Sequence, residues 1–238
     1  MASFLGVIVP VGPARLGEVD VAVRSVRRAD VDGVCEIIVV VDGPYEPDVR
    51  DVAGADVMVR LDRTYGPGTA RLAGALRSTC ESLFFLDSDD EMQPGAPQRA
   101  LADLADYAAV MYATADADGW GLAPRDFAAG VLDRGGIADR WLAGPIRQRT
   151  ANLCVRREAL LAAGGFSGLP RMEDWLVWAA ISESHPVLVS DFVARTYRDN
   201  PGGVIAGGWP KWLGGLATTW IPALVKARQQ VPAASPVP

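Results

Sequence analysis

The sequence predicts an α/β fold: one domain built on a doubly wound, mainly parallel sheet with helices on both faces. Short apolar runs, such as residues 6–11 and 36–41, have the length and composition of strands that are buried on both faces. Amphipathic segments alternate with these runs, as strand–helix–strand units require. The 238 residues, half of them apolar, fit one large domain better than two small ones.

The first half of the chain supplies most of the predicted elements. Strands are expected at residues 6–11, 36–41, 57–61, 82–86 and 109–114. Helices are expected at about 19–26, 69–79 and 96–106, where apolar residues recur at helical spacing. Turn-forming residues separate the two kinds of segment, so the alternation extends from the first strand to the last of this half.

The second half is less regular. Residues 116–145 are rich in Gly, Asp and Pro, which predicts a long connection with little structure of its own. A strand at 152–155, a short helix at 157–163 and a longer helix at 173–183 are expected after it. His185 and Pro186 then indicate a turn from helix to strand.

Composition and charge exclude several classes of function. The net charge is −6 and Lys and Arg do not cluster, so binding to nucleic acid is not expected. Cys35, Cys80 and Cys154 form no CxxC pair, which predicts free thiols in a reducing cytoplasm. The sequence has one histidine and no GxSxG motif, so neither a serine-hydrolase site nor a His-rich zinc site is expected. The N-terminus lacks a signal peptide, and glycines and a proline interrupt the apolar segment 204–225, so no transmembrane segment is expected.

Acidic residues follow two of the predicted strands, where open α/β sheets bind ligands. Asp42 follows the second strand, and Asp87-Ser88-Asp89-Asp90 follows the fourth. Asp and Ser also form ordinary turns and N-caps. Three carboxylates within four residues nevertheless repel one another, and a cation relieves that repulsion. Oxygen ligands suit Mg²⁺ or Mn²⁺, which would stabilise a diphosphate leaving group.

Two helix starts add further polar groups. Residues 66–71 (GPGTAR) would direct backbone amides and the Arg71 guanidinium toward a nucleotide, although the glycines also suit a simple loop. Glu173 and Asp174 begin the helix expected at 173–183. Acidic residues in a first turn commonly interact with the helix dipole, and the alternative is that one of the two acts as a general base. Neither GxGxxG nor GxxxxGK[ST] occurs, so Rossmann dinucleotide and P-loop sites lack their fingerprints.

Six segments form an ordered set of motifs. They are VIVPVG (7–12), EIIVVVDG (36–43), GPGTARLAGA (66–75), FFLDSDDEMQPG (84–95), TANLCVRREALLAAGGF (150–166) and MEDWLVWA (172–179). In sequence and in order they resemble the motifs of family-2 glycosyltransferases with the GT-A fold. The resemblance covers most of residues 6–183.

The resemblance implies a nucleotide-binding site. Its residues would be Pro10, Val11, Gly12, Asp42, Arg71, Asp87 and Ser88. Pro10 and Val11 would line the base, Asp42 would hydrogen-bond to the base, and Arg71 would lie near the nucleotide. The chain departs from the family's pattern in two places: Val41-Asp42 supplies one acid where two are common, and Ala70-Arg71-Leu72 lacks an asparagine.

The resemblance also implies the catalytic groups. Asp87 and Asp89 match the family's DxD motif and would hold Mn²⁺ or Mg²⁺, with Asp87 also toward the ribose. Asp174, next to Glu173, matches the second acid of the ED motif, which is the catalytic base in inverting members.

The acceptor side is less defined by sequence. Trp175 is a candidate acceptor contact, and Arg198 falls in a segment that could close on the diphosphate. Residues 116–145 and the tryptophans at 209, 212 and 220 are expected to shape the acceptor pocket, although the tryptophans equally suit packing.

These observations together predict a metal-dependent, inverting, hexosyltransferase-like enzyme. It would move sugar from a nucleotide sugar, with UDP favoured, to a hydroxyl of a glycan, peptide or small natural product. The domain would cover 1–228, with a nucleotide-sugar half at about 1–114, an acceptor half at about 115–228 and a disordered tail at 229–238. A homodimer is compatible with the sequence.

Two alternatives come from other classes of protein. A sugar-nucleotide nucleotidyltransferase shares the sheet and the metal-binding acids, but it would need a Gly-rich basic loop after the first strand. A non-catalytic nucleotide-sugar-binding subunit would bind the donor and leave it intact.

Overall fold

The structure is a computed structural model that describes residues 4–12, 16–44, 52–115, 121–122, 127–142, 153–166 and 173–198. The predicted tail at 229–238 and the tryptophans at 209, 212 and 220 lie outside the described residues. No helix among the described residues is both long and apolar enough to cross a membrane.

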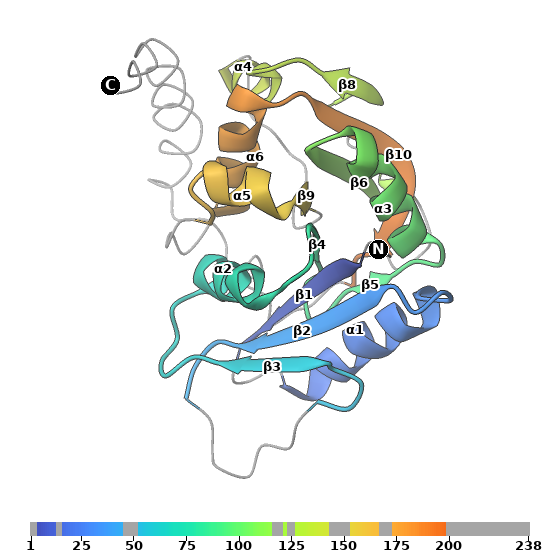
Figure 1. Cartoon of the computed structure of the whole chain (residues 1–238), viewed down its shortest axis with the longest axis vertical. Coiled ribbons are helices and arrows are strands. Elements are labelled where there is room, and N and C mark those ends of the chain that lie inside the picture. Colours follow the sequence, from blue (N-terminus) through green and yellow to red (C-terminus); the bar gives the residue numbers. More distant parts are fainter. Residues whose placement is uncertain are drawn as a thin grey trace.

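One sheet contains all the strands of the described residues, and eight of them follow the order β3-β2-β1-β4-β9-β6-β10-β5 (Figure 1). The other two, β7 and β8, pair with β6 and β10 respectively. The strands are β1 (Leu5–Val11), β2 (Cys35–Val41), β3 (Val57–Arg60), β4 (Ser82–Phe85), β5 (Glu91–Met92), β6 (Ala109–Ala115), β7 (Gly121–Leu122), β8 (Gly130–Leu132), β9 (Leu153–Arg156) and β10 (Val187–Thr196). Pairing is parallel from β3 through β4 and between β6 and β10. Strand β9 runs antiparallel between β4 and β6. Strands β5, β7 and β8 also pair antiparallel with their neighbours. The predicted α/β sheet is confirmed, with parallel pairing along the longer strands and antiparallel pairing elsewhere.

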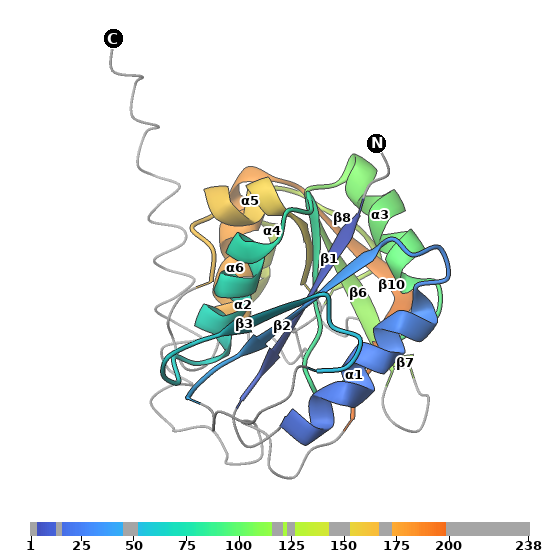
Figure 2. The same ribbon diagram turned by 60° about the horizontal axis from the view of Figure 1, so that its bottom comes forward.

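Helices cover both faces of the sheet, as Figure 2 shows. They are α1 (Leu16–Ala29), α2 (Pro67–Arg77), α3 (Ala96–Asp106), α4 (Gly136–Leu142), α5 (Arg157–Ala162) and α6 (Glu173–Ser184). Side chains of α1 and α3 form one apolar cluster with one face of the sheet, while those of α2, α4, α5 and α6 form another with the opposite face. Alternate residues of β1 serve the two clusters: Val7 and Val9 belong to the first and Ile8 to the second.

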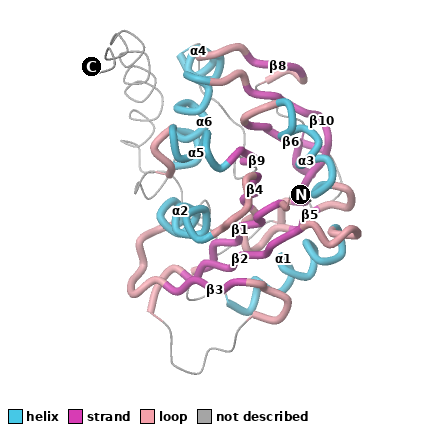
Figure 3. The backbone as a smooth tube through the Cα atoms, viewed as in Figure 1, coloured by secondary structure: helices cyan, strands magenta, loops and turns pink. Residues whose placement is uncertain are grey.

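The structure corrects the prediction for residues 116–145, because short elements lie within this segment (Figure 3). Strand β8 pairs with the start of β10, and α4 packs on α6. Their partners come from distant parts of the chain, so local sequence pattern carries little sign of them. The expected helix-to-strand turn is confirmed, since α6 ends one residue before His185 and β10 begins after Pro186.

The three cysteines are free and buried. Burial raises the pKa of Cys35 and Cys154 and raises that of Cys80 to about 11. The thiolate is the reactive form of cysteine, so none of the three is a candidate nucleophile.

Small residues let α2 approach the sheet closely. Gly74 faces the strands, and a Cβ at this position would lie 2.5 Å from Ile8 Cγ2 and 3.0 Å from Val40 Cγ2. These atoms belong to two buried strand residues that have no room to move. The close approach places Arg71, one turn earlier on α2, beside the sheet.

We therefore expect Gly74→Ala to lower the free energy of unfolding by about 1–3 kcal/mol, because the added methyl group overpacks the core. Urea denaturation measures the change. Gly17→Ala is the matched control, since a Cβ at Gly17 in α1 meets no atom within 4 Å. The control should be as stable as wild type or up to about 1 kcal/mol more stable. Equal stability of the two variants would contradict this account of how α2 packs.

Candidate active site

The candidate site lies at the carboxyl edge of the sheet, where the sequence predicted it. Asp42 directly follows β2, and Asp87 comes two residues after β4. Helices α2 and α6 begin at the same edge, where Arg71 of α2 contacts Glu173 of α6 and Asp87. A network of charged side chains thus connects segments that are far apart in the sequence.

Arg71 joins the two acidic motifs. Its Nη1 donates to Glu173 Oε1 at 2.6 Å, and its Nη2 donates to Asp87 Oδ1 at 2.7 Å. The residue is only 6% exposed. Burial alone would lower the pKa of Arg71, but Asp87 and Glu173 raise it above its usual value. The guanidinium is therefore a fixed positive charge between the two motifs.

Arg195 is the residue of this network that sequence reasoning missed. It lies in β10, is 1% exposed, and its Nη1 donates to a carboxylate oxygen of Asp90 and, at 3.5 Å, to Asp87 Oδ2. Its Nε lies 3.4 Å from Thr114 Oγ1 on the neighbouring strand β6. A single arginine in a predicted strand is ordinarily expected to be exposed to solvent. Its burial follows from the pairing of β10 with β6, which no local pattern indicates.

The network sets the charge of its acids. Burial would raise the pKa of Asp87, but Arg71 and Arg195 outweigh that effect and hold the pKa below its ordinary value. Burial raises the pKa of Asp90, and Arg195 opposes the rise. Burial and the neighbouring Asp174 raise the pKa of Glu173. Asp87 is therefore the acid of the network with the most firmly held negative charge.

The turn after β4 fits a hard cation only in part. Asp87 and Asp89 are partly exposed and supply carboxylate oxygens, the donors that Mg²⁺ and Mn²⁺ prefer. Asp90 is fully buried against Arg195 and Ser88 is also buried, so neither is placed as a ligand. Among the described residues no three acidic, His or Cys side chains form a metal-binding group. A cation here would take its remaining ligands from a diphosphate or water.

Asp42 holds the loop that precedes α2. Its carboxylate accepts the N–H groups of Tyr65, at 2.7 Å, and of Gly66, at 2.8 Å. Gly66 has φ +96°, a conformation that favours glycine. The predicted hydrogen bond from Asp42 to a base remains a prediction. Of the predicted nucleotide-binding residues in this part of the chain, Pro10 and Val11 are buried at the end of β1, whereas Gly12 is partly exposed.

The two acids at the start of α6 differ in environment. Glu173 is buried against Arg71, whereas Asp174 is partly exposed and accepts the Trp175 N–H at 2.8 Å. Trp175 is 5% exposed and stacks on Phe127, with ring centroids 6.4 Å apart. The geometry therefore gives Glu173 a contact within the network and leaves Asp174 the more accessible of the two acids. Trp175 has a packing role, and its predicted contact with an acceptor remains a prediction.

Arg198 ties the end of β10 to the turn after β4. Its backbone N–H donates to Asp90 Oδ1 at 3.2 Å, and its side chain pairs with Glu91 at 3.4 Å. Its predicted closure on a diphosphate is not tested by these contacts.

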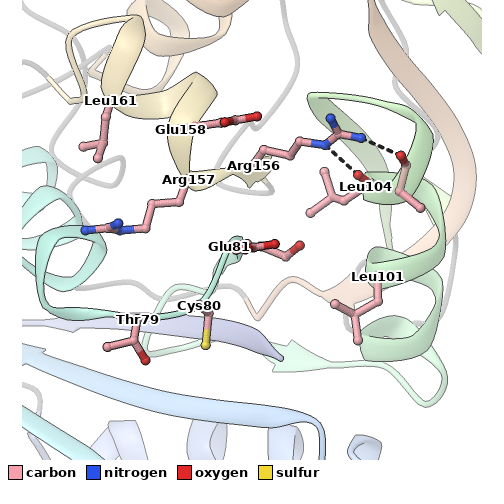
Figure 4. A pocket seen from close by; sticks show the side chains of 11 residues that line it. Thr79, Cys80, Glu81, Leu101, Leu104, Arg156, Arg157, Glu158 and Leu161 are labelled. Atoms are coloured by element: carbon pink, nitrogen blue, oxygen red, sulfur yellow. Dashed lines mark hydrogen bonds between the residues drawn. The ribbon is translucent and has the colours of Figure 1, made fainter. Parts of the chain in front are cut away.

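A pocket of about 540 Å³ lies at the opposite edge of the sheet, where β4 begins (Figure 4). Two of its arginines cap helices. Arg156 donates to the carbonyls of Leu104 and Ala105 at the end of α3, and Arg157 donates to the Ala75 carbonyl near the end of α2. Cations at helix C-termini stabilise the fold, and this pocket holds none of the predicted site residues.

Sequence comparison identifies the family. The sequence model of glycosyl transferase family 2 matches residues 7–169, a range that includes the turn after β4 and Arg71. The chain belongs to glycosyl transferase family 2. No curated protein sequence matches it significantly.

Solved structures of S. aureus TarS share the fold of this family-2 domain. TarS 1–349 in complex with UDP-GlcNAc superposes with a TM-score of 0.74 at 17% identity, over 96% of this chain and 68% of that one. Another structure of TarS 1–349 gives a TM-score of 0.64 at 19% identity, over 82% of this chain and 60% of that one. The chain spans 37% of the longer TarS chain, at 20% identity and a TM-score of 0.64. The predicted GT-A fold is thereby confirmed.

For Asp42→Asn we expect a loss of about 1–3 kcal/mol in the free energy of unfolding, because an amide NH₂ would face a backbone N–H donor in a buried site. Urea denaturation measures the loss. Asp62→Asn is the control: Asp62 accepts the Tyr65 hydroxyl at 2.9 Å at the surface of the same loop. Surface changes of this kind fall within about 0.5 kcal/mol. A stable Asp42→Asn variant would show that Asp42 does not hold the loop.

Proposed function

We propose that this protein transfers a sugar from a nucleoside diphosphate sugar to an acceptor hydroxyl, with inversion at the anomeric carbon and with Mn²⁺ or Mg²⁺. The observation that carries the proposal is the position of Arg71. This residue brings the acidic turn after β4 and the acidic start of α6 to one edge of the sheet. A donor diphosphate near the first motif would then lie close to a base on the second.

The chemistry follows from the two acids of α6. The carboxylate of Asp174 takes the proton of the acceptor hydroxyl, and the acceptor oxygen forms a bond to the anomeric carbon. The bond from that carbon to the diphosphate oxygen breaks, and its electron pair leaves with the nucleoside diphosphate. Glu173 is held by Arg71 at 2.6 Å, so it orients the guanidinium and leaves the proton transfer to Asp174.

A divalent cation would neutralise the charge of the departing diphosphate. Asp89 and Asp87 are the residues that would hold it. Both guanidiniums of the network contact Asp87, so we assign the main ligand role to Asp89.

UDP is the nucleotide we favour. The support is the fold shared with TarS, one structure of which contains UDP-GlcNAc. For the acceptor we propose a hydroxyl of a glycan, a peptide or a small natural product. We also propose a cytoplasmic location, and a homodimer is compatible with the proposed function.

A thermal-shift panel tests the donor site. UDP, GDP, dTDP and CDP are each added with and without Mn²⁺ to wild type and to Asp89→Ala. We expect UDP with Mn²⁺ to raise the melting temperature of wild type, because a ligand that binds only the folded state stabilises it, and to lose this effect in Asp89→Ala. Calorimetry confirms any negative result.

The panel and two activity assays together separate this proposal from the alternatives. No shift with any nucleotide, confirmed by calorimetry, contradicts the donor site. Binding of UDP-sugar without turnover over a broad acceptor panel indicates the non-catalytic subunit. Pyrophosphate release from a sugar phosphate and a nucleoside triphosphate indicates the nucleotidyltransferase.

Asp174→Asn tests the base. We expect turnover to fall by at least about a hundredfold, the usual contribution of a general base, while the dissociation constant of UDP stays unchanged. Glu173→Gln is the comparison, because it removes the charge that Arg71 contacts and should weaken UDP binding. Near-normal turnover in Asp174→Asn would show that another group accepts the proton.

A further inference from the structure

We propose that Arg195 is a positioning residue for donor binding: it holds Asp87 and Asp90, and so fixes the turn after β4 against the nucleoside diphosphate. The inference rests on the proposed function, since it concerns the same site. Nothing in the sequence motifs points to Arg195, which lies in β10, three residues before Arg198.

Arg195 acts through other residues. It is 1% exposed, so a ligand at the carboxyl edge of the sheet cannot touch its side chain. Its strand pairs with β6 through Arg195 and Thr114, and this pairing fixes where the guanidinium lies. What reaches the candidate site is the partly exposed carboxylate of Asp87.

Asp87 is held from two sides. Arg71 of α2 contacts its Oδ1 and Arg195 of β10 contacts its Oδ2. Two fixed cations on the two oxygens of one carboxylate determine its orientation as well as its charge. With one of them removed, Asp87 would rotate about the remaining contact.

Asp90 alone would compensate the charge of Arg195. Asp90 is fully buried and is the nearest acid to the guanidinium, so it supplies the opposite charge that a buried arginine needs in the folded protein. The additional contact from Arg195 to Asp87 is not needed to compensate this buried charge. It links the buried pair to a residue of the candidate site.

The test separates folding from positioning. Arg195→Met and Asp90→Asn each leave a buried charge without its partner, so each single variant should lose stability. Combined, they remove both charges, and the double variant should regain most of the melting temperature. We expect it still to bind UDP with Mn²⁺ at least about tenfold more weakly than wild type, because Asp87 lacks one charged hydrogen bond. Calorimetry gives the affinity.

A second variant serves if the double variant does not fold. Arg195→Lys keeps the positive charge beside Asp90 but replaces the forked guanidinium with a single ammonium group, which cannot hold both acids in the same geometry. It too should bind UDP more weakly. Arg156→Met is the matched control, because Arg156 caps α3 at the opposite edge: its melting temperature should fall and its UDP affinity should stay unchanged.

The outcomes are distinct. Wild-type UDP affinity in the folded double variant, or in Arg195→Lys, overturns the positioning role and leaves the proposed function intact. A wild-type protein that binds no nucleotide overturns the proposed function and the positioning role together. A wild type that binds UDP but transfers no sugar overturns transfer alone, because the positioning role is measured by affinity.

Discussion

The site depends on a chain of alternating charges, Glu173, Arg71, Asp87, Arg195 and Asp90, all of them buried except the partly exposed Asp87. Each charge has a neighbour of opposite sign, which compensates the cost of removing it from water. The members come from α6, α2, the turn after β4 and β10, so the site exists only when all four are in place. The charge pairs that stabilise the fold are therefore the same ones that assemble the candidate site.

Packing brings the charges close enough to pair. The backbone of α2 lies against β1 and β2 because Gly74 has no side chain to hold it away. Arg71 thereby reaches both Asp87 and Glu173 with one guanidinium. Phe166 completes the enclosure, with its ring 5.8 Å from that guanidinium. A bulky residue in place of the glycine would act on the site through the position of the helix.

The elements that sequence predicted well are those whose signals are local. Helix α3 has its expected bounds at 96 and 106, since its apolar spacing and an early proline mark it plainly. Strands β1 and β2 begin only one residue before their predicted starts. Their positions could be predicted closely because each strand is a continuous apolar run. The acidic turn and Arg71 were found because their residues stand in recognisable motifs. Arg195, β8 and α4 depend on partners far along the chain, and no local spacing encodes such pairing.

Strand β9 has a consequence for how the protein can be divided. Among the described strands, β9 is the one that joins β4 on one side and β6 on the other. A fragment that ends before Leu153 would leave both of these strands with unpaired backbone groups along an apolar edge, a template for aggregation. The predicted nucleotide-sugar half at about 1–114 is therefore not expected to fold by itself, although its motifs are contiguous in sequence. Expression and dissection of this protein should keep residues 4–198 together.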